Sequence, residues 1–258
     1  MSPSQIHADN AVWWNETASW YAPKEVDEGL ETLRVGGNLL DESERELLGD
    51  LATWCGRAIH LQCSHGREAL SLLNLGAREV VGVDISDKML EAARRRSDEL
   101  GAKASWVCSD VLNAPTELDA TADLVYTGKG ATCWMMDLDA WAAVVVRLLK
   151  PGGRFFIYEG HPLDWVWDTN AAGYQLDAHH GDYFDQGYRD RAFMAKTQNQ
   201  PHYRQWTLAD TMNSLIRAGL IIDHLGEYSE PFWGQFPNIP NETLKRLPHT
   251  FSILAHKS

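Results

Sequence analysis

The sequence lacks long apolar runs, clustered cysteines and an excess of basic residues. No stretch approaches the ~20 apolar residues of a membrane-spanning helix. The first residues, MSPSQIHADNAVWW, have neither the basic region nor the apolar region of a secretory signal. The four cysteines are scattered without C-x-x-C spacing, as is typical of reduced, packed thiols. We therefore expect a cytoplasmic protein without a membrane partner.

The charge balance excludes a nucleic-acid-binding face. There are 23 Lys and Arg residues against 36 Asp and Glu residues, a formal net charge of -13. Binding a phosphate backbone needs a basic surface. The acidity suits a neutral or cationic small molecule, although solubility is the simpler explanation. No H-E-x-x-H pattern occurs, and the adjacent His179 and His180 near Asp182 point in different directions, so we expect no metal site.

The stretch RAIHLQCSHGREALSLLNLGAREVVGVDIS predicts a strand, a turn, a helix and a second strand. Residues 58–61 form the first strand, residues 62–66 the turn, residues 67–75 the helix and residues 79–83 the second strand, which ends at Asp84. Ligands of such parallel units bind outside the carboxyl ends of the strands, where both the turn and Asp84 fall.

This placement favours a nucleoside ligand. Gly66 lets the backbone approach a ligand closely at the start of a helix, and a carboxylate after the next strand can accept hydrogen bonds from ribose hydroxyls. The dinucleotide fingerprint G-x-G-x-x-G needs three glycines, whereas the turn QCSHGRE has one. A nucleoside without phosphates therefore fits better than a pyrophosphate.

The segment HLQCSHGREALSLLNLGAREVVGVDIS resembles the first two motifs of class I S-adenosylmethionine-dependent methyltransferases, particularly a bacterial small-molecule branch. Ser64 and His65 stand where glycine is frequent in that family. The resemblance extends from about residue 14 to about residue 228 and implies S-adenosyl-L-methionine as cofactor.

Strands that alternate with helices predict one doubly wound α/β domain. The resemblance implies a seven-stranded Rossmann-like sheet of order 3-2-1-4-5-7-6, with the last strand antiparallel between strands five and six. We expect a single domain over residues 1–258. Its parts are a helical cap over 1–56, whose first helix covers 11–22, a cofactor-binding core over 57–159, a lid over 160–206, and a C-terminal helix with strands over 207–258.

The resemblance also implies the cofactor-binding residues. Asp84 would bind the ribose, and Asp110 would accept from the adenine amino group. For Tyr21, Met89 and Asp110 a purely structural role stays open: an aromatic staple, a core residue and a solvated loop residue, respectively. The full set is Tyr21, Gln62, Cys63, Ser64, Gly66, Asp84, Ile85, Met89, Asp110, Val111 and Thr127.

The segment 160–206 is too long for a plain connection and is rich in His, Trp, Tyr and Asp, which indicates a lid over the acceptor. The alternative for each aromatic residue is packing within the lid. His161 directly follows the fifth strand and is the candidate general base, or else a residue that shapes the turn. The candidate acceptor-binding residues are Trp14, His161, Trp165, Tyr183, Tyr203 and Trp206.

We therefore expect methyl transfer from S-adenosylmethionine to a small organic acceptor whose nucleophile is nitrogen, oxygen or carbon. A nicotinamide-dependent oxidoreductase is the alternative chemistry, against which the missing G-x-G-x-x-G counts. An inactive protein that only binds S-adenosylmethionine is the alternative without catalysis. Both a monomer and a homodimer stay open.

Overall fold

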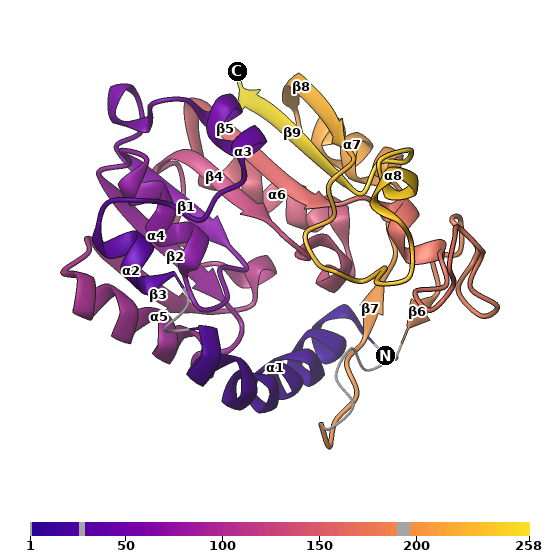
Figure 1. Cartoon of the computed structure of the whole chain (residues 1–258). Coiled ribbons are helices and arrows are strands. Elements are labelled where there is room, and N and C mark those ends of the chain that lie inside the picture. The colour runs from indigo at the N-terminus through magenta and orange to yellow at the C-terminus, as the bar shows by residue number, and fades with distance from the viewer. Residues whose placement is uncertain (1, 26–28, 190–196) are drawn as a thin grey trace.

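A mixed seven-stranded sheet forms the centre of the molecule (Figure 1). The computed structural model describes residues 2–25, 29–189 and 197–258. The strand order is β3-β2-β1-β4-β5-β9-β8, with β9 antiparallel to both β5 and β8, which confirms the expected order. The strands are β1 Arg57–Leu61, β2 Glu79–Asp84, β3 Ala104–Cys108, β4 Ala122–Gly128, β5 Leu149–Gly160, β8 Leu220–Tyr228 and β9 Thr250–Lys257.

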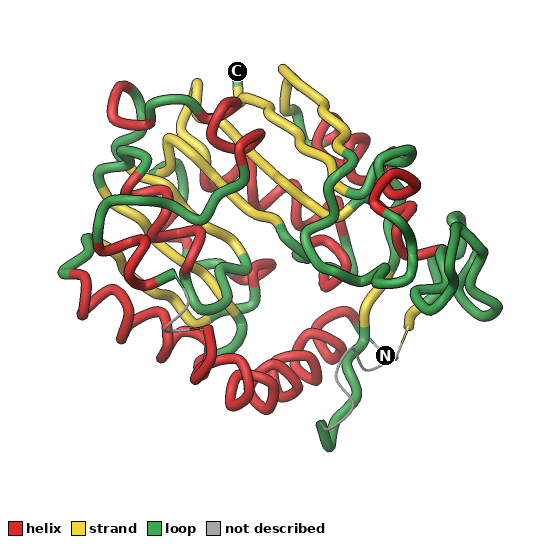
Figure 2. Tube along the Cα trace, in the orientation of Figure 1, coloured by secondary structure: helices red, strands yellow, loops and turns green. Residues whose placement is uncertain are grey.

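Helices cover both faces of this sheet (Figure 2). Neighbouring residues of one strand face opposite layers. Phe155 belongs to the core shared with α6 and α7, whereas Phe156 belongs to the core shared with α3 and α4. The helices that flank the strands are α4 Arg67–Asn74, α5 Asp87–Leu100, α6 Leu138–Leu148 and α7 Leu208–Arg217.

The N-terminal region forms a helical cap whose first helix is longer than the sequence predicted. Helix α1 spans Pro3–Glu25 instead of beginning near residue 11, and α2 Leu30–Arg34 and α3 Glu42–Leu48 follow it. Proline is tolerated in the first turn of a helix, because the amide hydrogen it lacks has no intrahelical partner there. Helix α1 packs against α5 and continues toward β7 (Figure 1).

The segment after β5 contains little regular structure. Its described parts include a 3-10 helix at Pro162–Val166 and a short pair of strands, β6 Tyr188–Arg189 and β7 Tyr203–Arg204. The connection from β8 to β9 carries α8 Asn241–Leu244. In the part of the chain that the structure describes, no helix has both the length and the apolarity needed to cross a bilayer.

The indole of Trp106 on β3 packs against Gly82 of β2 and against Gly66 in the turn between β1 and α4. A Cβ at Gly82 would lie 2.4 Å from the Trp106 ring and 2.7 Å from the Sγ of Cys63. A Cβ at Gly66 would lie 2.4 Å from the same ring. Because protein interiors are close-packed, the ring leaves no room for a side chain at either position.

We predict that Gly82→Ala destabilises the protein by about 1–3 kcal/mol, because the added methyl group must displace the indole or the thiol. Urea unfolding measures the effect. Gly173→Ala is the matched control, since nothing lies within 4 Å of a Cβ there. Equal unfolding midpoints for the two variants would contradict this description of the packing.

A buried ionic cluster joins α3 to the sheet. Glu44 is fully buried, accepts a 2.6 Å hydrogen bond from the hydroxyl of Tyr126, and lies 3.1 Å from the Nζ of Lys129. Burial raises the pKa of Glu44 to about 7, and Lys129 offsets only part of this effect. Burial lowers the pKa of Lys129, but the carboxylates of Glu44, Glu68 and Asp41 outweigh burial and raise it above its ordinary value.

The raised pKa of Glu44 predicts a pH-dependent stability. The folded state holds the Glu44 proton more tightly than the unfolded state, so this contribution is complete below pH 4.5 and is lost as the pH rises to about 7. The free energy of unfolding of the wild type, relative to Glu44→Gln, should fall by about 3 kcal/mol across this window.

Chemical denaturation at a series of pH values measures this difference. Glu46→Gln is the control, because Glu46 is exposed on the same helix. Parallel stability profiles for the wild type and Glu44→Gln would refute the assignment.

Candidate active site

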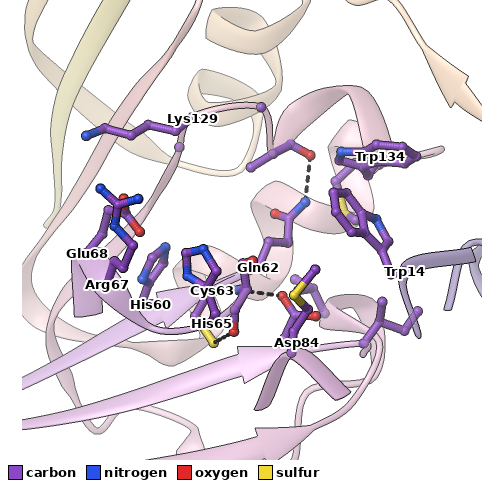
Figure 3. Close-up of a pocket in the computed structure, with 18 of the residues that line it drawn as sticks. Trp14, His60, Gln62, Cys63, His65, Arg67, Glu68, Asp84, Lys129 and Trp134 are labelled. Carbon is purple, nitrogen blue, oxygen red and sulfur yellow. Dashed lines mark hydrogen bonds between the residues drawn. The ribbon is translucent and has the colours of Figure 1, made fainter. Parts of the chain in front are cut away.

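A cavity of about 470 Å³ opens at the carboxyl ends of β1, β2 and β4 (Figure 3). Its walls come from distant parts of the chain, because parallel strands bring their following loops to one edge of the sheet. They include one face of α1, the turn after β1, the end of β2, the loop at 128–135 and the segment 231–233.

The carboxylate of Asp84 links the end of β2 to the turn after β1. Its Oδ2 accepts from the backbone N–H of Ser64 at 2.7 Å, and its Oδ1 accepts from the backbone N–H of Ser86 at 2.9 Å. Burial raises the pKa of Asp84, while these backbone hydrogen bonds oppose the rise. Each carboxylate oxygen has a second acceptor position, so Asp84 can accept two further hydrogen bonds from a ligand.

The turn at 62–66 adopts left-handed backbone conformations, two of them without glycine. Gln62 has φ 56°, Ser64 has φ 49° and Gly66 has φ 81°. The Nε2 of Gln62 donates to the carbonyl oxygen of Ala131 at 2.6 Å, whereas its buried Oε1 has no partner among the described residues. The turn therefore lines the cavity with an unsatisfied polar atom.

Asp110 lies on the same wall, at the end of β3. Its Oδ1 accepts from the backbone N–H of Leu112 at 3.0 Å, and its Oδ2 lies 2.8 Å from the Nδ1 of His7 on α1. Three apolar residues that follow β2 and β3, Ile85, Met89 and Val111, also line the cavity. Met89 is a buried residue of α5 and also lines the cavity, so it belongs both to the core and to the site.

One end of the cavity is polar. Figure 3 shows His60, Arg67, Glu68 and Lys129 together at this end. Burial raises the pKa of Glu68, but the positive charge of Lys129 and of neighbouring basic groups outweighs burial and lowers it. Burial lowers the pKa of His60 to about 4, and its Nδ1 has no partner among the described residues. This end therefore offers a polar atom without a protein partner to a ligand or to water.

The opposite end is aromatic. The rings of Trp14 and Trp134 lie 5.0 Å apart edge to face, and Trp13 stacks on Trp134 at 5.5 Å. Phe232 and Trp233 of the β8–β9 connection line the cavity as well, and the ring of Phe232 lies 5.9 Å from the Nζ of Lys129, nearer the polar end. The faces of Trp14 and Trp134 form the end away from Lys129. These faces suit an apolar or aromatic molecule.

His161 lies outside this cavity, and both of its ring nitrogens have partners. Its Nδ1 accepts from the backbone N–H of Leu163 at 3.1 Å, so its Nε2 carries the hydrogen and donates to Glu227 at 3.0 Å. Burial lowers the pKa of His161, an effect that Glu227 opposes. This geometry favours the alternative in which His161 shapes the turn after β5.

The aromatic residues expected in the lid are also apart from the main cavity. Trp165, Tyr203 and Trp206 line a separate space of about 20 Å³. The hydroxyl of Tyr183 accepts from the backbone N–H of Leu208 at 3.2 Å. These side chains pack against the loop at 134–135 and the start of α7 rather than lining the main cavity.

The structure brings most of the expected cofactor residues together and adds others. Gly66 and Thr127 do not line the cavity, and the side chain of Tyr21 lies outside the part that the structure describes. The expected residues that do line it are Trp14, Gln62, Cys63, Ser64, Asp84, Ile85, Met89, Asp110 and Val111. The sequence analysis missed His7 and Asn10, whose spacing from Trp14 places all three on one helical face.

Comparisons with known proteins agree with this geometry. Residues 58–153 match the family model of the methyltransferase domain. The chain is 31% identical over 192 residues to methyltransferase phqN of Penicillium fellutanum, an alignment that covers 66% of this chain. The chain spans 57% of the length of that curated relative.

Two solved structures share the fold. An S-adenosylmethionine-dependent methyltransferase from Mesorhizobium loti matches with a TM-score of 0.63 and 25% identity, over 83% of this chain and 96% of the other. Geranyl diphosphate C-methyltransferase from Streptomyces coelicolor A3(2) matches with a TM-score of 0.62 and 15% identity, over 98% of each chain. The chain thus carries a methyltransferase domain over residues 58–153, and the sheet order and these relatives support a class I S-adenosylmethionine-dependent methyltransferase.

Proposed function

We propose that this protein transfers the methyl group of S-adenosylmethionine to a small organic acceptor. The observation that carries the proposal is the cavity at the strand ends, with the carboxylate of Asp84 on its wall and an aromatic surface at one end. The residues present fit the cofactor, because the buried Oε1 of Gln62 and Nδ1 of His60 at the cavity wall have no partner within residues 2–25, 29–189 and 197–258. Buried polar groups of this kind require a hydrogen-bonding ligand or water.

The nucleoside part of the cofactor fits the wall between Asp84 and Asp110. Asp84 has free acceptor positions for the two ribose hydroxyls. Ile85, Met89 and Val111 offer apolar contact to a purine ring, and Asp110 can accept from its amino group.

The amino-acid part of the cofactor fits the polar end. A carboxylate and an ammonium group require opposite charges close together, and Lys129 and Glu68 supply them in one region of the wall. The Nζ of Lys129 lies 2.9 Å from Asp41 and 3.1 Å from Glu44, which offsets its repulsion of the sulfonium.

The chain would promote the reaction mainly by orientation and exclusion of water. The cofactor supplies a methyl group already activated by its sulfonium. The cavity walls hold both reactants in line, and such orientation can contribute about 7–11 kcal/mol. A general base contributes less, about 10²–10⁴-fold. The hydrogen bonds of His161 leave it no free lone pair, so we assign no base.

The aromatic end is the proposed acceptor site. Trp14 and Trp134 form it, and their faces suit a molecule with an apolar or aromatic portion. Incubation with S-adenosylmethionine and a panel of small amines, phenols and thiols tests this by the release of S-adenosylhomocysteine. Tight binding of S-adenosylhomocysteine without turnover across the panel would support the inactive binding protein instead.

We predict that Asp84→Asn weakens binding of S-adenosylhomocysteine by roughly 10- to 150-fold, the equivalent of the 1.5–3 kcal/mol of a hydrogen bond to a charged group. Titration calorimetry measures the affinity. The exposed Asp98→Asn on α5 is the matched control and should bind like the wild type.

NAD serves as the comparison ligand in the same calorimeter. Tighter binding of NAD than of S-adenosylhomocysteine would favour the oxidoreductase. If Asp84→Asn binds S-adenosylhomocysteine as tightly as the wild type, the proposal that this carboxylate binds the ribose is wrong.

A further inference from the structure

Helix α1 crosses the cavity and is fastened at several points. His7, Asn10 and Trp14 lie on its cavity face. The amide of Asn10 donates to the carbonyl oxygen of His202 at 2.7 Å and accepts from the N–H of His202 at 2.8 Å. Asn15 accepts from the hydroxyl of Ser86 at 2.6 Å. His7 forms a hydrogen bond with Asp110.

The hydrogen bonds of His7 define its tautomer. Its side chain is 2% exposed, and its Nε2 lies 3.3 Å from the backbone nitrogen of Met136, from which it accepts. The Nδ1 therefore carries the hydrogen and donates to the Oδ2 of Asp110 at 2.8 Å. A neutral histidine thus holds the carboxylate from a second element of the fold.

This contact orients Asp110 toward the cavity. The backbone N–H of Leu112 donates to Oδ1 of Asp110, and His7 donates to Oδ2. The plane of the carboxylate is therefore held from both sides. Each oxygen retains one acceptor position, and 15% of the side chain stays exposed at the wall. A carboxylate accepts hydrogen bonds but donates none when ionised, so it distinguishes a ligand amino group from a carbonyl oxygen.

We propose that His7 is a positioning residue that sets the specificity of this site for a 6-aminopurine, through its hydrogen bond to Asp110. The proposal rests on the function proposed above. It adds His7 as a specificity determinant, 103 positions before Asp110 in the chain. A purine with a carbonyl oxygen in place of the amino group would face the carboxylate with an acceptor, and the two acceptors repel each other.

Fastening of α1 alone is the competing explanation for His7. Asn10 separates the two roles, because its side-chain hydrogen bonds fasten the same helix to His202, whereas that of His7 goes to Asp110. Substitution of His7 should change the ratio of the affinities for different ligands. Substitution of Asn10 should lower the affinity for all ligands by the same factor.

The test measures the dissociation constants of S-adenosyl-L-homocysteine and S-inosyl-L-homocysteine, which carries the carbonyl oxygen, by titration calorimetry. The wild type should prefer the adenosyl ligand by at least about tenfold. His7→Ala should reduce the preference to about threefold or less, and His7→Gln should restore part of it, because its amide can donate to Asp110. Asn10→Ala should keep the wild-type preference. Thermal unfolding of each variant identifies any that fail to fold.

An equal preference in His7→Ala and the wild type would overturn the proposal, as would an equal loss in Asn10→Ala. A wild type that binds both ligands equally would overturn it as well. A wild type that binds neither ligand would instead refute the proposed function.

A double-mutant comparison tests the route through Asp110. In the Asp110→Asn background, His7→Ala should leave the remaining preference unchanged. The same reduction in both backgrounds would show that His7 acts independently of Asp110 and would refute the positioning role.

Discussion

The site depends on one carboxylate that joins the ends of two neighbouring strands. Asp84 accepts from Ser64 in the turn after β1 and from Ser86 at the start of α5. Without these donors a buried carboxylate would be too costly, because burial alone favours its neutral form. With them, the same group fixes the shape of the turn, holds the N-cap residue of α5 and retains acceptor positions for a ligand. Packing supports the arrangement, since the indole of Trp106 fills the space beside Gly66 and Gly82.

The ionised groups around the cavity are arranged in pairs that share the cost of burial. Glu44 and Lys129 join the helical cap to β4, and Lys129 also borders the cavity. Its positive charge lowers the pKa of Glu68, so one lysine acts on a structural carboxylate and on a cavity carboxylate. Stability of the cap and the electrostatics of the polar end are therefore coupled, and a substitution at Lys129 would affect both.

Local sequence patterns were sufficient for the strands and helices of the core and for the part of the site next to β1 and β2. Alternating apolar strands and helices with Gly or Asp boundaries predicted the core, and the resemblance supplied the order of its strands. The turn at 62–66 and Asp84 were predictable because they are adjacent to one strand–helix–strand unit. His7 and Asn10 were not, since they reach the cavity from a helix far away in the sequence. The bond of His161 to Glu227, 66 positions away, likewise leaves no local signal.

Gln62 and Ser64 hold left-handed conformations that glycine would adopt without strain. Each non-glycine residue there costs about 1–2 kcal/mol in the folded state. Side chains also restrict the backbone more than glycine does, so the loop has fewer conformations to lose when a ligand arrives. A turn of this composition exchanges folding stability for preorganisation, and the entropic cost of ordering the loop is met during folding instead of during each catalytic cycle.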